Sequence, residues 1–91
     1  MNAKRRKELS KAISKLEEAK AALEEAKETV ETCKDEEEES YDNLPESMQE
    51  GEKGDTMQEN IDGLDEAFGN IEDMPDTIDE AINLIQEAID R

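Results

Sequence analysis

The sequence predicts an all-α protein folded as an antiparallel helical hairpin, and three observations support this. Apolar residues recur every seven positions in two long segments of matching length, which is typical of packed helices. The residues between them are rich in Glu, Lys and Arg, which favour helices. A stretch with proline and glycine separates the two segments. Low hydrophobicity with high charge otherwise indicates disorder, so the periodicity decides the fold class.

The first segment predicts a helix over about residues 4–40. Its apolar residues form two rows that lie three positions apart, which is the spacing of a packed helix face. Leu9, Leu16, Leu23 and Val30 make one row, and Ala12, Ala19, Ala26 and Cys33 make the other. The alternation of large and small side chains favours the close approach of a partner helix. Cys33 is then expected to be a packed core thiol.

The second segment repeats in sevens from Ile61, with three apolar positions in each repeat. The rows are Ile61, Phe68, Pro75, Ile82 and Ile89; Leu64, Ile71, Ile78 and Ile85; and Ala67, Met74, Ala81 and Ala88. Proline removes a backbone donor and clashes with the preceding turn, so we expect this arm to be kinked or broken near Pro75. The predicted helices are about 55–72 and 75–90. Asp55 and Gln58 resemble a capping box at the start.

A linker over residues 41–54 is expected to connect the two arms. Pro45 should end the first helix and begin a short turn that stops at Gly51. Three apolar side chains are expected to cover the apolar end of the hairpin: Tyr41, Leu44 and Met48.

Residues 1–91 then form a single helical domain whose core is thin for a monomer. Leu84 falls outside the three apolar rows and would face solvent in a lone hairpin. We therefore expect a homodimer that forms a four-helix bundle. Its buried residues are expected to be Ile61, Leu64, Phe68, Ile71, Ile78, Ile82 and Ile85, packed with the row from Leu9 to Val30.

Composition excludes several classes of function. The chain has 91 residues, 28 acidic and 11 basic, with a net charge of −17, and only 33% are apolar. So acidic a surface repels a phosphate backbone, which argues against binding of nucleic acid. Without histidine and with one cysteine, the chain lacks the usual zinc ligands and the commonest acid–base catalyst. We expect no enzyme activity, no cofactor, no metal site and no membrane span. A lone cysteine suits a reducing, cytoplasmic location.

Charge is concentrated in residues 35–66, where fourteen acidic side chains face Lys53 alone. The first helix also begins with basic residues and ends with acidic ones, against its dipole. The basic start, Lys4, Arg5, Arg6 and Lys7, is expected to pair with Asp79, Glu80, Glu87 or Asp90. Three interpretations of the acidic region stay open: a solubilising surface, a site for a basic partner, and a weak site for divalent cations. The candidate partner-binding residues are Glu36, Glu37, Glu38, Glu39, Asp42, Glu46, Glu50, Glu52 and Asp55.

Residues 35–67 resemble small acidic helical proteins that prophages and mobile elements of Gram-positive bacteria encode. In those proteins an acidic run precedes an aromatic residue, an Asn-hydrophobic-Pro-Glu motif, a loop with glycine, and heptads. The matching residues here are Tyr41, Asn43, Leu44, Pro45, Glu46, Gly54, Met57, Ile61 and Leu64. Pro75 departs from the uninterrupted heptads of that group. The resemblance implies a helical fold and a phage or mobile-element origin, and it attaches no established function.

Two hypotheses about function follow. In the first, the protein is an acidic inhibitor that meets a basic surface on a nucleic-acid-binding host protein, by charge or by mimicry of DNA. In the second, it is a structural coiled-coil module that docks through its apolar stripe, and its charge serves only solubility. Salt separates them, because binding driven by charge weakens as salt rises and apolar docking does not.

Overall fold

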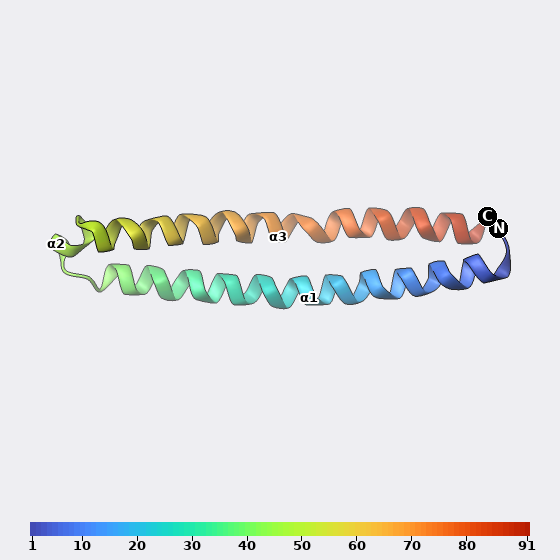
Figure 1. Ribbon diagram of the computed structural model, residues 1–91, viewed down its shortest axis with the longest axis horizontal. Coiled ribbons are helices and arrows are strands. Elements are labelled where there is room, and N and C mark those ends of the chain that lie inside the picture. Colours follow the sequence, from blue (N-terminus) through green and yellow to red (C-terminus); the bar gives the residue numbers. More distant parts are fainter. The chain divides into compact units, whose positions relative to one another are not determined.

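The computed structural model describes residues 1–91 and consists of helices and short connections (Figure 1). Helix α1 spans Ala3–Asp42, α2 spans Glu46–Gln49 and α3 spans Glu52–Asp90. Together they include 91% of the residues, and the chain has no strand. The prediction of an all-α protein is confirmed.

Contacts divide the chain into two units, and each unit contains parts of α1 and α3. Unit 1 comprises Met1–Glu25 and Asp73–Arg91, and unit 2 comprises Ala26–Glu72. Within each unit the two helical segments lie side by side and run antiparallel (Figure 1). Unit 1 holds both ends of the chain, and unit 2 holds α2 and the loop around it.

Helix α1 begins at a polar cap. The side-chain oxygen Oδ1 of Asn2 accepts a hydrogen bond of 2.8 Å from the backbone N–H of Arg5, which satisfies a donor at the helix start. The first turn of α1 contains no acidic residue and its last turn contains no basic residue. Because the helix dipole favours the opposite arrangement, the charges weaken both ends of α1, as the sequence predicted.

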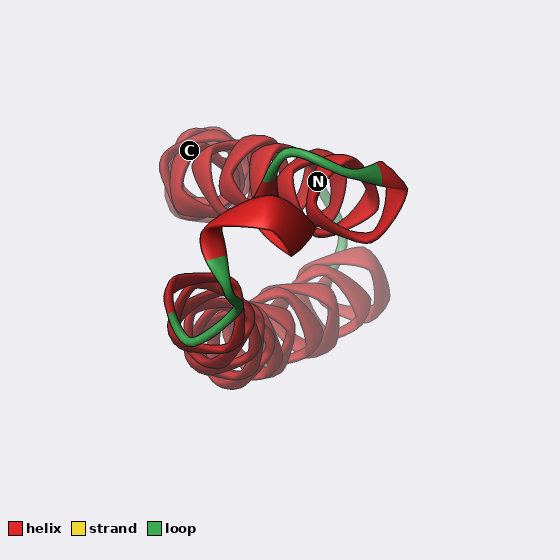
Figure 2. Ribbon diagram, turned by 90° about the vertical axis from the view of Figure 1, so that its left-hand side faces the viewer, coloured by secondary structure: helices red, strands yellow, loops and turns green.

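The loop between α1 and α3 contains the short turn expected after Pro45. The backbone carbonyl of Pro45 accepts hydrogen bonds from the N–H groups of Met48 at 2.8 Å and Gln49 at 3.1 Å, and these bonds form α2. Figure 2 looks onto this loop and shows α2 between the end of α1 and the start of α3. The three apolar residues expected to cover the end of the hairpin differ in burial. Tyr41 and Leu44 are half-buried, whereas Met48 is 41% exposed.

Helix α3 begins earlier than predicted. Its first residue is Glu52, and the backbone N–H of Asp55 donates to the carbonyl of Gly51 at 3.0 Å. Asp55 therefore lies inside the first turn and does not cap it. The predicted capping box at Asp55 and Gln58 was wrong, because the chain already turns into a helix directly after Gly51.

Helix α3 also continues through Pro75 without a break. The helix end expected at residue 72 and the new start at 75 are not observed. Proline removes one donor, whose acceptor would be the carbonyl of Ile71, but its backbone φ suits a helix. The turns on both sides of this position keep their own hydrogen bonds.

The second row predicted for α1 contacts α3 over only part of its length, since Ala12 and Ala19 are half-buried. Ala26 and Cys33 are exposed, so Cys33 is not a core thiol. The row from Leu9 to Val30 is half-buried, and beside it a second half-buried row contains three lysines: Arg6, Ile13, Lys20, Lys27, Lys34 and Tyr41. Lysine takes core-flanking positions because its alkyl stem covers apolar surface while its ammonium group reaches an acid.

These lysines contact α3 in both units. In unit 1 the Lys20 Nζ lies 2.5 Å from the Asp79 Oδ1, and in unit 2 the Lys34 Nζ lies 3.3 Å from the Asp65 Oδ1. The hydrogen bond to the carboxylate raises the pKa of each lysine above its ordinary value. Lys27 Nζ lies 5.9 Å from the centre of the Phe68 ring, within reach of a cation–π contact.

The pairing expected for the basic start of α1 is not formed. Asp79 pairs with Lys20, and Glu87 lies 3.8 Å from Arg91 on its own helix. The contact of Lys20 with Asp79 sets the register of the two helices in unit 1. In that register Leu9 is level with Asp90, so Lys4–Lys7 lie beyond the acids that were expected to meet them.

No helix of the structure combines the length and the apolar character that crossing a bilayer requires.

Candidate protein-interaction site

The nine candidate partner-binding residues all belong to unit 2, and we call them the acidic pole. They lie on the last turns of α1, on α2 and its flanks, and on the first turn of α3: Glu36, Glu37, Glu38, Glu39, Asp42, Glu46, Glu50, Glu52 and Asp55. Glu37 is half-buried and the other eight are exposed. The loop between α1 and α3 therefore places in one unit the residues of the acidic pole, which are separated by up to nineteen positions in the sequence.

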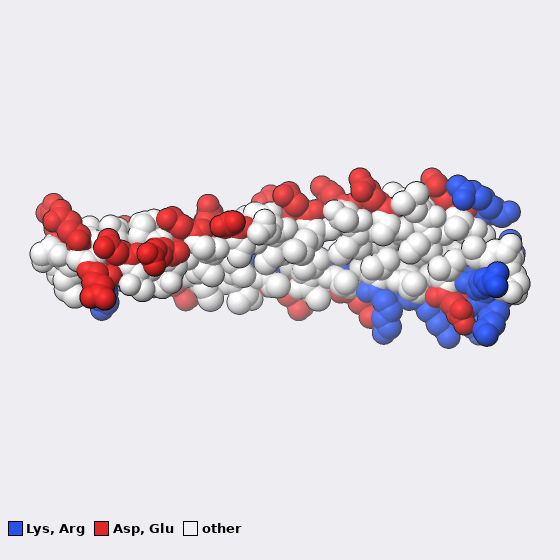
Figure 3. All heavy atoms as spheres, turned by 45° about the horizontal axis from the view of Figure 1, so that its top comes forward, with Lys and Arg blue, Asp and Glu red and all other residues white.

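Negative charge in unit 2 is weakly compensated. The unit contains 17 acidic residues and three basic ones, so it carries −14 of the total charge of −17. None of the nine residues of the acidic pole takes part in an ion pair. Glu37 accepts a hydrogen bond of 3.0 Å from the Asn60 amide, and Lys34 is directed to Asp65. Figure 3 shows Asp and Glu gathered over the part of the chain around α2, and most Lys and Arg over the part near the chain ends.

Eight residues of the acidic pole fall into two groups by position on the helices, and the ninth, Glu50, is the C-cap residue of α2. Glu46 lies in the first turn of α2, and Glu52 and Asp55 lie in the first turn of α3, where the helix dipole favours negative charge. These three residues therefore stabilise the helices that carry them. The five members on α1 lie near its C-terminus, where the dipole disfavours them, so helix stability does not account for that group.

The acidic pole lies over the best-packed part of the molecule. Met57 and Ile61 on α3, 9% and 7% exposed, are the buried hydrophobic residues of the chain, and both belong to unit 2. Tyr41 and Leu44 are half-buried in the same unit. The packing of these apolar side chains fixes the backbone that carries the acidic pole, so the pole is not carried on a mobile linker.

Gln49 closes the end of α1. Its side-chain amide Nε2 donates to the backbone carbonyl of Tyr41 at 2.9 Å and to that of Leu44 at 3.2 Å. The Tyr41 carbonyl belongs to the last turn of α1 and also accepts from the backbone N–H of Leu44 at 3.1 Å, whereas the Leu44 carbonyl lies in the loop after α1. A side chain from α2 thus ties the C-terminus of α1 to the loop.

Gly54 allows α3 to approach this loop. It is buried, and a Cβ atom at this position would lie 2.0 Å from the Gln49 carbonyl oxygen and 2.5 Å from the carbonyl carbon. Real Cβ atoms do not approach backbone so closely, so only glycine fits. The loop is therefore built around one glycine and one glutamine; Gly54 was noted in the sequence only as the loop glycine of the resemblance, and Gln49 was not noted.

A hollow of about 190 Å³ opens at the side of the acidic pole. Its lining contains two carboxylates, an aromatic ring, an amide and an aliphatic side chain: Glu38, Asp42, Tyr41, Gln58 and Ile61. Carboxylates attract a cationic side chain, and an aromatic ring adds a favourable contact with its charge. The arrangement suits a lysine or arginine of a partner protein.

The structure places no group of three or more Asp, Glu or Cys side chains close enough together to hold a metal ion.

Comparisons of the chain with protein-family models, with curated proteins and with solved structures find no match.

Proposed function

We propose that this protein is a non-enzymatic acidic binding protein of a phage or mobile element. It inhibits a nucleic-acid-binding host protein, such as a defence protein, by presenting the acidic pole to that protein's basic surface. The observation that carries the proposal is the group of exposed carboxylates near the C-terminus of α1, which the helix dipole disfavours and no basic residue neutralises. The resemblance of residues 35–67 to prophage proteins supplies the expected origin.

The density of charge in unit 2 supports mimicry of nucleic acid. Its segment of α3, residues 52–72, is about 31 Å long at ~1.5 Å per residue. A net charge of −14 over that length is about one charge per ~2.2 Å, against one per ~1.7 Å of B-DNA. A basic groove that accepts DNA would therefore meet a comparable density of negative charge.

We place this activity in the cytoplasm of a bacterial host cell. Cys33 is a free thiol with an exposed side chain, which suits a reducing compartment. A bend at Pro75 and self-association into a homodimer belong to the same proposal. The half-buried apolar rows of both helices support self-association, since a lone pair of helices leaves them partly exposed.

The alternative is a structural module that docks through apolar surface while its charge serves solubility. The exposure of Leu84, at 67%, is the observation that favours it. The two proposals differ in the role of the acidic pole, and one variant separates them.

The test changes Glu36, Glu38 and Glu39 to Gln. Captured host proteins are identified at low and at high salt, and each is then tested for displacement from duplex DNA. A control variant changes Asp76 and Asp90 to Asn and Glu17 to Gln, which removes the same charge from unit 1. We expect wild type and control to capture a DNA-binding protein and to displace it from DNA, with steep loss in salt.

We expect the triple Gln variant to bind more weakly and to melt at an equal or higher temperature, because like charges at the end of α1 repel each other. A lower melting temperature would show that the charges stabilise the fold. Undiminished capture by this variant at every salt concentration would favour the structural module.

A further inference from the structure

Unit 1 leaves its apolar residues incompletely covered. It contains eight large aliphatic residues on the contacting rows, and all are half-exposed: Leu9, Ile13, Leu16, Leu23, Ile78, Ile82, Ile85 and Ile89. Two further side chains of α3 in this unit are more exposed still, Met74 at 44% and Leu84 at 67%. None of the hydrophobic residues that the molecule buries lies in unit 1.

The two more exposed residues, Met74 and Leu84, lie on the same side of unit 1. The pair of Lys20 with Asp79 marks the opposite side of the contact between α1 and α3. From that pair, helical periodicity leads across the contacting rows to the row of Ala12 and Ala19 and then to Ala22 on α1, and to the rows that begin at Met74 and Thr77 on α3. We call their eight members the alanine face: Ala12, Ala19, Ala22, Met74, Thr77, Ala81, Leu84 and Ala88.

On α3 this face carries no charge from Met74 to Ala88, whereas on α1 Glu8 and Lys15 share the row of Ala22. Solvent-exposed positions elsewhere on α3 of unit 1 carry acids, including Asp76 and Asp90. Small side chains also let another helix approach closely, since the distance between helix axes depends on the residues at the contact. Leu84 and Met74 then supply the large apolar side chains of an interface.

Charges at the edges of the alanine face select a second copy as the occupant. The α3 edge is acidic, with Asp73, Glu80 and Glu87, whereas the α1 edge carries Lys4, Lys11 and Lys15, with Glu8 and Glu18 among them. In the view of Figure 3, the uncharged surface near the chain ends has mainly red side chains along its upper edge, with blue ones at the end, and mainly blue ones, with some red, along its lower edge. A two-fold axis that sets the α1 edge of one copy beside the α3 edge of the other joins opposite charges.

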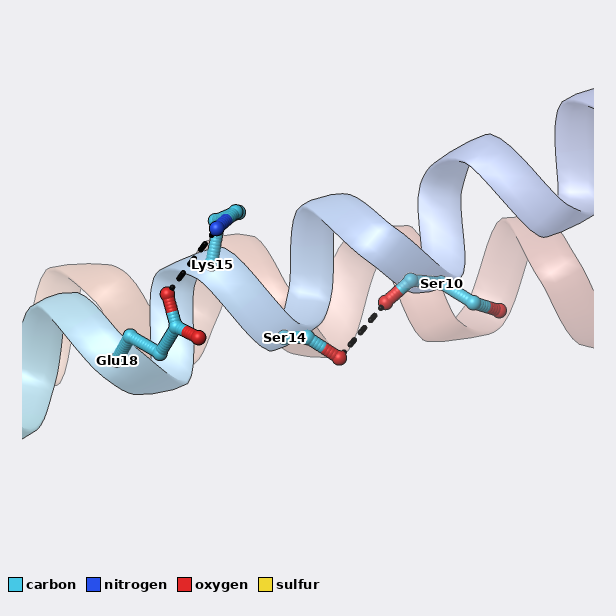
Figure 4. A network of polar contacts seen from close by, with 4 residues as sticks. All are labelled: Ser10, Ser14, Lys15 and Glu18. Carbon is cyan, nitrogen blue, oxygen red and sulfur yellow. Dashed lines mark hydrogen bonds and ion pairs between the residues drawn. The ribbon is translucent and has the colours of Figure 1, made fainter.

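The polar residues on the outer side of α1 bond only within this helix, so the α1 edge can form contacts with a second copy. Ser14 Oγ donates to the Ser10 carbonyl at 3.3 Å, and Lys15 lies 3.4 Å from Glu18, so these four residues contact only their own helix (Figure 4). Such an exposed pair within one helix is weak and can exchange for a partner across an interface. Unit 1 has a net charge of only −3, so repulsion between copies is small there.

We propose that a second copy of this chain covers the alanine face of unit 1 in a two-fold symmetric dimer. This deepens the self-association within the proposed function and changes its interface. Ile71, Ile78 and their row serve the contact between α1 and α3 within one chain, and Leu84 with its uncharged neighbours serves the contact between chains.

The test compares Leu84→Glu with Asn83→Glu. Both place the same charge on neighbouring exposed positions of α3, but Asn83 lies outside the alanine face. Sedimentation and the concentration dependence of the melting temperature measure the dimer, and circular dichroism measures helix content. We expect wild type and Asn83→Glu to form dimers, and Leu84→Glu to dissociate with a dissociation constant raised roughly tenfold or more at unchanged helix content.

Two more variants protect the test from effects on folding. Leu84→Ala should weaken the dimer without adding charge, and Ala22→Glu should weaken it from the α1 side of the face. A wild-type protein that stays monomeric at high concentration would overturn the proposal, as would a dimer that tolerates both Leu84→Glu and Ala22→Glu. Equal dissociation by Asn83→Glu would also overturn it, because charge alone would then govern association.

The outcome is separable from that for the acidic pole. Changing Glu36, Glu38 and Glu39 to Gln should leave the dimer intact, and Leu84→Glu should still bind the host partner. A wild-type protein that stays monomeric but still captures the host partner would therefore remove this inference alone.

Discussion

In unit 2, Met57 and Ile61 are buried beneath a net charge of −14, whereas in unit 1 no hydrophobic side chain is buried and the net charge is −3. Charge that served only to keep apolar residues in solution would be expected where those residues are exposed. Here the densest charge lies where packing is best. The comparison indicates that unit 2 presents its charge on a firm base, and that unit 1 offers apolar surface to a partner.

The largest expected effect concerns the loop of unit 2. Gly54→Ala should destabilise the protein by about 3 kcal/mol, because its Cβ would lie 2.0 Å from the backbone oxygen of Gln49. Gly63→Ala is the matched control, since a Cβ there meets nothing within 4 Å and should stabilise α3 by about 0.4–1 kcal/mol. Urea unfolding followed by circular dichroism measures both. Equal effects of the two substitutions would show that the loop is loosely packed.

The second prediction compares burial in the two units directly. Ile61→Ala should cost about 2–4 kcal/mol, because Ile61 is 7% exposed and its truncation leaves a cavity. Ile82→Ala, in unit 1, should cost only about 1 kcal/mol, because the side chain is already half-exposed. The same unfolding experiment measures the difference. A larger cost at Ile82 would reverse the assignment of the better-packed unit.

The third prediction tests the tie between α2 and α1. Gln49→Ala should cost about 1–2 kcal/mol, because the Leu44 carbonyl loses the Gln49 donor and the Tyr41 carbonyl keeps only the Leu44 N–H. Gln86→Ala, in unit 1, removes only an exposed bond of 3.1 Å to Asp90 on the same helix and should cost about 0.2–0.5 kcal/mol. Hydrogen exchange of the amides in the loop should increase for Gln49→Ala alone. Unchanged exchange would mean that water replaces Gln49 without loss.

The two long helices of this protein could be predicted from the sequence, but the residues through which they contact each other could be predicted only in part. Seven-residue spacing predicts α1 and α3 because burial of an apolar stripe repeats with the helix turn. Ala26 and Cys33 were wrongly predicted to be packed, because apolar character was weighed above the equal spacing of Lys20, Lys27 and Lys34. The spacing of Asp65, Glu72 and Asp79, also seven residues, was a signal for the acids that two of these lysines meet.

Other features had no signal along the chain. Gln49 reaches carbonyls five and eight positions before it, and Gly54 contacts backbone five positions before it. These contacts depend on how the loop folds back, which residue types alone do not encode. The acidic pole could be listed from the sequence, but its division by helix dipole required the start of α3 at Glu52.

The smallest expected effect is a dependence on alkaline pH that both units share. Donation to Asp79 raises the pKa of Lys20, and donation to Asp65 raises the pKa of Lys34. A pKa that is raised in the folded state means that the folded protein holds the proton more tightly than the unfolded chain does. The resulting stabilisation is fully present below the unfolded pKa, near 10.5, and is lost as pH rises through the higher folded value.

We therefore expect the free energy of unfolding to be insensitive to these two lysines between neutral pH and about pH 10, and to fall above it. Lys20→Met and Lys34→Met each remove one of the two contributions while keeping an apolar stem on the contacting row. Each variant should lose less stability than wild type between neutral and alkaline pH, measured by urea unfolding across that range. The two lysines lie in different units, so each variant reports on its own unit. A variant whose stability depends on pH as that of wild type does would show that its unit gains no stability from the ion pair. Equal changes in both variants would show that a lysine–aspartate pair stabilises the contact between α1 and α3 in both units.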